Sequence, residues 1–155
     1  MSLVSGILPA TNVVVGLDVA SKKRAFERIG ELLEAGSHLA HNTVFESLFA
    51  REKLGSTGLG EGIAIPHGRI KGLHEAVGAL IKLKTPIPFD APDGRPVSLL
   101  FVLLVPEQAT DMHLQILGEL AQMFSDKPMR TRLGACDDAS ELFRLVQEWS
   151  PHDPG

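Results

Sequence analysis

A glycine-rich segment that ends in a histidine holds the residue types of this chain that are best suited to chemistry. Four glycines fall within the eight residues from Gly55 to Gly62, and a short apolar run then leads to His67. Glycines at this density indicate that the backbone turns sharply or lies close to another group. A histidine directly after such a loop is a candidate nucleophile or proton carrier.

The glycines do not match a nucleotide-binding loop. A Walker A loop places Lys and then Ser or Thr after its last glycine, whereas Ile63 and Ala64 follow Gly62 here. A dinucleotide-binding fingerprint reads G-x-G-x-x-G after a strand, whereas this segment reads G-x-G-x-G after a helical pattern. We therefore interpret the glycine-rich segment as backbone that surrounds the histidine, and we expect no nucleotide cofactor.

Two further side chains suit a phosphoryl group. Arg51 lies just before the glycines, at the edge of the apolar stripe of a predicted helix. It could cover the edge of the core with its aliphatic stem, or it could hold a phosphoryl group by two parallel hydrogen bonds. His113 follows Asp111 in the first turn of another predicted helix, where the helix N-terminus favours an anion and lowers a histidine pKa. By position alone it could equally be a surface residue.

Four other histidines fall in polar, loop-like or terminal settings, and we expect them to be exposed and inert: His38, His41, His74 and His152. A metal site finds little support, because the chain has no H-x-x-x-H pair and no HExxH motif. Phosphoryl transfer through His67 fits better. Backbone N–H groups of the loop and the hydroxyls of Ser56 and Thr57 would add hydrogen bonds to the transferred group. We expect no metal ion and no cofactor.

Composition narrows the class of protein. The chain has 155 residues and a net charge of −4, which suits one domain and argues against binding to nucleic acid. A single cysteine, Cys136, excludes an intrachain disulfide and fits a reducing compartment. The longest strongly apolar run, residues 99–105, is too short to span a bilayer, and residues 1–20 lack the pattern of a secretory signal. We therefore expect a cytoplasmic protein that is not inserted in a membrane.

Hydrophobic periodicity predicts an α/β fold with a mixed central β-sheet flanked by helices. Strands are predicted at residues 13–19, 63–66, 76–83 and 97–105, and helices at residues 21–35, 43–54, 111–124 and 138–149, with a short helix beginning at Asp126. Thr43 and Glu46 have the spacing of a capping box. The last two strands are joined without a crossover helix, so the sheet should not be wholly parallel. We expect one domain over residues 8–149, with flexible termini at residues 1–7 and 150–155.

The segment R-E-K-L-G-S-T-G-L-G-E-G-I-A-I-P-H, from Arg51 to His67, resembles the active-site signature of fructose/mannitol-type enzyme IIA domains. These domains belong to the bacterial phosphoenolpyruvate phosphotransferase system. Residues 89–106 and 113–121 also fit, and the resemblance covers nearly the whole chain. Within the family, the sequences G-I-A-I-P-H-G-R and F-D-A-P-D-G are typical of the nitrogen-regulatory branch.

The resemblance implies a phosphohistidine at His67, formed with a histidine phosphocarrier protein of the NPr or HPr type as donor. Arg51 and His113 match the family's supporting arginine and second histidine. In the nitrogen-regulatory branch the phosphorylation state selects target proteins, such as potassium-transport components or sensor kinases. Two alternatives stay open: a sugar-specific IIA component that passes the phosphoryl group to a IIB domain, and a non-catalytic protein-binding regulator.

Overall fold

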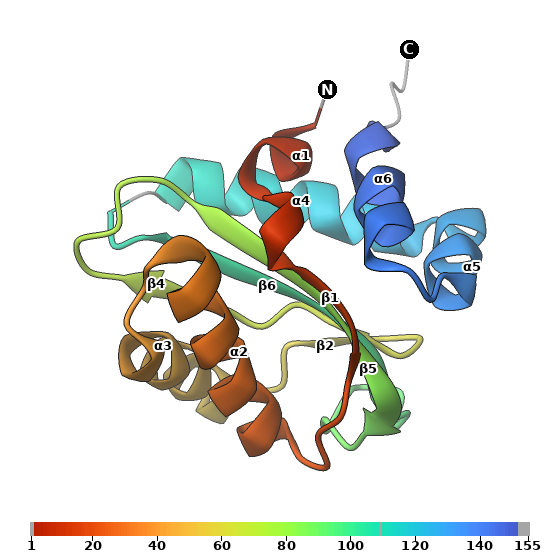
Figure 1. Cartoon of the computed structure of the whole chain (residues 1–155), viewed down its shortest axis with the longest axis horizontal. Coiled ribbons are helices and arrows are strands. Elements are labelled where there is room, and N and C mark those ends of the chain that lie inside the picture. Colours follow the sequence, from red (N-terminus) through yellow and green to blue (C-terminus); the bar gives the residue numbers. More distant parts are fainter. Residues whose placement is uncertain (1, 109, 152–155) are drawn as a thin grey trace.

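The described part of the chain, residues 2–108 and 110–151 of the computed structural model, forms a mixed six-stranded sheet with helices on both faces (Figure 1). The strands are β1 (Val13–Leu17), β2 (Gly58–Gly60), β3 (Ile63–Ala64), β4 (His67–Ile70), β5 (Val77–Ile87) and β6 (Val97–Pro106). The helices are α1 (Leu3–Ile7), α2 (Lys22–Ser37), α3 (His41–Lys53), α4 (Thr110–Ser125), α5 (Lys127–Ala135) and α6 (Ala139–Glu148), with a 3₁₀ turn at Ala10–Asn12. The predicted α/β class with a mixed sheet is confirmed.

Strand β6 is the centre of the sheet, as its nearly continuous apolar sequence predicts. It pairs antiparallel with β5 along one side, and parallel with the two short strands β3 and β4 along the other. Helices α2 and α3 cover one face of the sheet, and α1, α4, α5 and α6 cover the other, each over its own apolar core. Strands β3 and β4 follow one another along the same edge of β6, so His67 stands where the second of them begins.

The junction between α2 and α3 differs from the predicted capping. Helix α3 begins at His41, and its N-cap residue Ala40 makes no side-chain hydrogen bond, so the capping box expected at Thr43 and Glu46 is wrong. Instead, Glu34 of α2 accepts a hydrogen bond from the backbone N–H of His41 at 2.9 Å. A carboxylate from a neighbouring helix therefore satisfies the exposed N-terminus of α3, a contact that local sequence does not encode.

The N-terminal segment is not the flexible end expected for residues 1–7. Leu3–Ile7 form helix α1, and the side chain of Val4 is fully buried. The side-chain amide of Gln147 in α6 donates a hydrogen bond to the carbonyl of Ser5 at 3.0 Å. Tertiary contacts therefore order a segment too short to be stable as an isolated helix. Residues 152–155 of the other expected flexible end, with His152, lie outside the described residues.

Among the described helices, none has the length and apolar character needed to cross a membrane.

Candidate functional site

The side chains of strand β4 alternate between the two faces of the sheet, and this alternation sets the direction of His67. Gly68 and Ile70 are buried on the side of helix α3, whereas His67 and Arg69 point the other way. Gly68 allows this close packing, since a Cβ atom at that position would lie 3.1 Å from the backbone carbonyl carbon and oxygen of Ser47. The Ser47 hydroxyl also donates a hydrogen bond to the carbonyl of Arg69 at 2.9 Å. Helix α3 and strand β4 are thus held tightly together beside the histidine.

The tautomer of His67 follows from one contact. Its Nδ1 lies 2.8 Å from the carbonyl oxygen of Ile65. A carbonyl oxygen only accepts hydrogen bonds, so Nδ1 carries the proton and Nε2 keeps a free lone pair. Burial lowers the pKa of His67, the bond to Ile65 partly opposes this, and the positive charge of Arg51 lowers the pKa further. The ring is therefore neutral near pH 7, which is the form that acts as a nucleophile.

His113, in the first turns of α4, lies directly beside His67. The two ring centroids are 5.5 Å apart and the planes meet at 66°. The Nε2 atom of His113 is buried and has no hydrogen-bond partner among the described residues. Burial, followed by the charges of His67 and Arg69, lowers the pKa of His113. An unpaired buried polar atom is costly, so a ligand oxygen at this point would complete a missing hydrogen bond.

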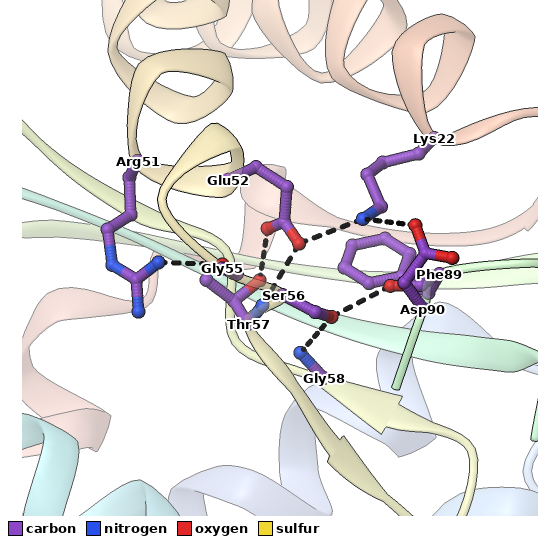
Figure 2. A network of polar contacts seen from close by, with 9 residues as sticks. All are labelled: Lys22, Arg51, Glu52, Gly55, Ser56, Thr57, Gly58, Phe89 and Asp90. Atoms are coloured by element: carbon purple, nitrogen blue, oxygen red, sulfur yellow. Dashed lines mark hydrogen bonds and ion pairs between the residues drawn. The ribbon is translucent and has the colours of Figure 1, made fainter. Parts of the chain in front are cut away.

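Arg51 lies in the last turn of α3, where the helix leads into the glycine-rich segment. Its Nη1 donates a hydrogen bond to the carbonyl of Gly55 at 2.8 Å (Figure 2). This bond uses one of the five N–H donors of the guanidinium and sets its direction. The positive charge of Arg51 acts on the pKa of His67, and the His67 ring lies 5.5 Å from the ring of His113, so these three side chains lie in one region of the structure.

Ser56 and Thr57 are placed differently from what we expected. The Ser56 hydroxyl donates to the carbonyl of Phe89 at 2.7 Å, and the Thr57 hydroxyl donates to Glu52 at 2.6 Å (Figure 2). Both hydroxyl groups therefore stabilise the glycine-rich segment through these hydrogen bonds, and neither donates its proton toward His67. The physical reason is that a tightly turned segment must satisfy its own buried polar groups first.

Glu52 is the residue of this region that sequence reasoning missed. It is adjacent to Arg51, about 100° round the helix, and the sequence predicted no role for it. The structure instead buries it, with 8% of its surface exposed. The only sequence signal was a carboxylate at the end of a helix, five residues before a threonine, which is too common a pattern to single out.

The described residues offer no cluster of three His, Cys, Asp or Glu side chains that could hold a metal ion. The side chains that this region offers for chemistry are a neutral imidazole, a guanidinium and a second imidazole.

Comparison with known proteins shows the family to which the chain belongs. A family model described as "Phosphoenolpyruvate-dependent sugar phosphotransferase system, EIIA 2" matches residues 6–149. The chain belongs to this family. Its members are phosphotransfer components, and residues 6–149 are almost all of the ordered fold described above.

The similar proteins point to the nitrogen-regulatory branch, as the resemblance predicted. A nitrogen regulatory protein of Pseudomonas aeruginosa is 45% identical over 141 residues, covering 90% of this chain and 92% of the relative. The crystal structure of IIA-Ntr from Neisseria meningitidis has a TM-score of 0.88 and 54% identity, covering 94% of this chain and 99% of that one. The crystal structure of IIA mannitol from Escherichia coli has a TM-score of 0.75 and 25% identity, covering 89% and 97%.

Proposed function

We propose that this chain is a cytoplasmic phosphocarrier of the nitrogen-related phosphotransferase system, and that Nε2 of His67 carries the phosphoryl group. The donor is a histidine phosphocarrier protein of the NPr or HPr type. One observation carries the proposal: the bond from Nδ1 of His67 to Ile65 leaves Nε2 as the nucleophilic nitrogen, beside a buried Nε2 of His113 that has no partner among the described residues.

The transfer step follows from this tautomer. The lone pair on Nε2 of His67 forms a bond to the phosphorus of the donor's phosphohistidine. The donor's N–P bond breaks, and its electron pair returns to the donor's imidazole ring. The proton on Nδ1 stays on the bond to Ile65, so no proton is lost from His67 in this step. Arg51, and His113 with its proton on Nε2, stabilise the charge on the phosphoryl oxygens.

Regulation of other proteins would follow from the charge that the phosphoryl group adds to an exposed surface. Apolar side chains are exposed on both elements that border the site: Leu54 and Leu59 near the glycines, and Met112 and Leu114 beside His113. A new negative charge among such side chains changes which partner surfaces fit. Potassium-transport components and sensor kinases are the kinds of target expected for the nitrogen-regulatory branch.

A sugar-specific role is less well supported. The identity to IIA mannitol is 25%, against 54% to IIA-Ntr. Transfer from the phosphorylated chain to a IIB domain would favour the sugar-specific role. A pure binding regulator would take up no phosphoryl group at all.

The first test is the intact mass of the protein after incubation with phosphoenolpyruvate, enzyme I and either the NPr-type or the HPr-type phosphocarrier. Wild type should gain one acid-labile phosphoryl group, with NPr as the better donor, and His67→Ala should gain none. His74→Ala is the matched control, because His74 is an exposed histidine outside the site, and it should behave as wild type. No adduct on wild type with either donor would overturn the proposal.

A further inference from the structure

The carboxylate of Glu52 is a buried charged group that the transfer step does not use. One oxygen accepts hydrogen bonds from Lys22 at 3.0 Å and from the backbone N–H of Thr57 at 2.9 Å. The other accepts from the Thr57 hydroxyl at 2.6 Å (Figure 2). Burying a carboxylate costs free energy unless it is paired and hydrogen-bonded, and these three donors satisfy that requirement.

The donors come from separate parts of the chain. Lys22 is the first residue of α2, and its ammonium also lies 4.5 Å from the centre of the Phe89 ring. The carbonyl of Phe89 in turn accepts the Ser56 hydroxyl, and Ser56 Oγ accepts the backbone N–H of Gly58 at 3.0 Å. Glu52 therefore connects the start of α2, the end of α3 and the loop at Phe89 to the beginning of the glycine-rich segment (Figure 2).

This network reaches the site through Arg51. The segment from Gly55 to Thr57 is held at one end by Glu52, through two hydrogen bonds to Thr57. At its other end, the carbonyl of Gly55 accepts the bond that directs the Arg51 guanidinium. Gly55 has a φ of 154°, and its backbone N–H donates a hydrogen bond to the carbonyl of Glu52 at 3.2 Å. Glu52 thus contacts this turn on both sides of the Gly55 carbonyl, with its backbone carbonyl at Gly55 and its carboxylate at Thr57.

We propose that Glu52 is a positioning residue for phosphoryl transfer: its buried carboxylate holds residues 55–57 in the turn that directs Arg51 toward His67. This inference rests on the proposed function. Glu52 does not touch the phosphoryl group. It affects binding of the phosphoryl group indirectly, by holding the turn that directs the Arg51 guanidinium. The transfer rate is sensitive to the position of that guanidinium, because a shift of about 1 Å can slow a reaction about a hundredfold.

The charge of Glu52 has a second consequence at the site. Burial has the largest effect on the pKa of His67, and the nearby charges of Arg51 and Glu52 act on it in opposite directions. Arg51 lowers this pKa and Glu52 raises it. Removing the carboxylate should therefore lower the pKa of His67 further, which an NMR titration of the ring would detect.

The test is a double-mutant cycle on the rate of phosphorylation by the NPr-type carrier. Four proteins are compared: wild type, Glu52→Ala, Arg51→Ala and the double variant. Glu52→Gln is added because its amide can keep the shape and donate to the Thr57 hydroxyl oxygen, which protects the test if Glu52→Ala does not fold. Glu27→Gln is the matched control, since Glu27 forms an exposed ion pair with Arg24 on α2. Denaturant unfolding confirms that each protein is folded in the assay.

We expect Glu52→Ala to slow transfer at least about tenfold in the wild-type background, but at most about twofold when Arg51 is already absent. Glu52→Gln should give a smaller loss and a lower His67 pKa, and Glu27→Gln should match wild type. Equal losses from Glu52→Ala in both backgrounds, or wild-type rates in the folded Glu52 variants, would overturn the positioning role while leaving the phosphocarrier in place. Failure of wild type itself to take up a phosphoryl group would instead overturn the proposed function, and this inference with it.

Discussion

At the scale of single residues, the site depends on which nitrogen of each histidine is free. The carbonyl of Ile65 holds the proton of His67 on Nδ1, so the reactive lone pair is on Nε2. The buried Nε2 of His113 has no hydrogen-bond partner in the described part of the chain, so an acceptor oxygen of a ligand would satisfy it. In the proposed transfer step, the same two side chains therefore act as nucleophile and hydrogen-bond donor without any change of protonation at neutral pH.

Replacing His113 tests the donor role. His113→Ala should slow phosphorylation of His67 by about 10- to 100-fold, the range expected for a lost hydrogen bond to a charged group, without removing the acceptor. The measurement is the rate of the acid-labile mass increase, with His74→Ala as the control. A variant that is phosphorylated as fast as wild type would show that His113 does not stabilise the transferred group.

At the scale of elements, the contact between α3 and β4 decides where His67 lies. Gly68 and Ser47 form the closest part of this contact, and Arg51 and Glu52 follow on the same helix. Any change that separates α3 from β4 would therefore move the nucleophile and its arginine relative to one another.

Gly68→Ala should disturb this contact. The added Cβ atom would collide with the Ser47 hydroxyl oxygen and would lie 3.1 Å from the backbone of Ser47, so the serine side chain must rotate away and the helix or the strand must shift. We expect a loss of about 1–3 kcal/mol in the free energy of unfolding, typical of overpacking, together with slower phosphorylation.

The matched control for that change is Gly118→Ala, on α4. No atom lies within 4 Å of a Cβ built at Gly118, and the residue is exposed in a helix. Denaturant unfolding should show a gain of up to about 1 kcal/mol there, because alanine is the better helix former. If Gly68→Ala were as stable and as active as wild type, the close packing would not be what positions His67.

At the scale of the whole molecule, two layers of helices bury the central strand β6, and the site lies at the edge where the short strands β3 and β4 pair with it. Both histidines of the site are partly removed from water by this fold, and burial is the main reason that their pKa values are lowered. The fold therefore opposes their protonation, and its stability depends on pH.

Acidification should destabilise the protein as the pH falls from about 6.5, the ordinary histidine pKa, toward the lowered values of the folded state. In that window the unfolded chain binds more protons than the folded one, so the free energy of unfolding decreases. Above this pH range both histidines are neutral in the folded and the unfolded state, so they do not decrease the free energy of unfolding. Denaturant unfolding at pH 7.5 and 5.5 should show a smaller decrease for a His67→Gln/His113→Gln double variant than for wild type. Equal decreases would mean that these histidines are not responsible.

Several features of the protein were determined by its sequence alone. Two local features were enough to predict a mixed sheet. The continuous apolar run of β6 indicates a strand buried on both faces, and the short loop before it, which has no crossover helix, indicates antiparallel pairing with β5. The helix predicted over residues 21–35 is present at Lys22–Ser37, and its N-cap Ser21 accepts a hydrogen bond from the Arg24 N–H at 3.1 Å. The family resemblance named His67, Arg51 and His113 as the site, and this assignment stays a prediction for the phosphorylation experiments.

Other features were decided by the tertiary structure, because they depend on groups that are distant in sequence. Glu34 caps α3 from another helix, and Val4 is buried only because α1 packs on the folded domain. The Thr57 hydroxyl donates to Glu52 because this carboxylate is buried at the end of α3, with Lys22 of α2 beside it. Local sequence records which residues can cap, donate or ionise, whereas the folded arrangement of elements decides which partner each of them meets and how far water is excluded.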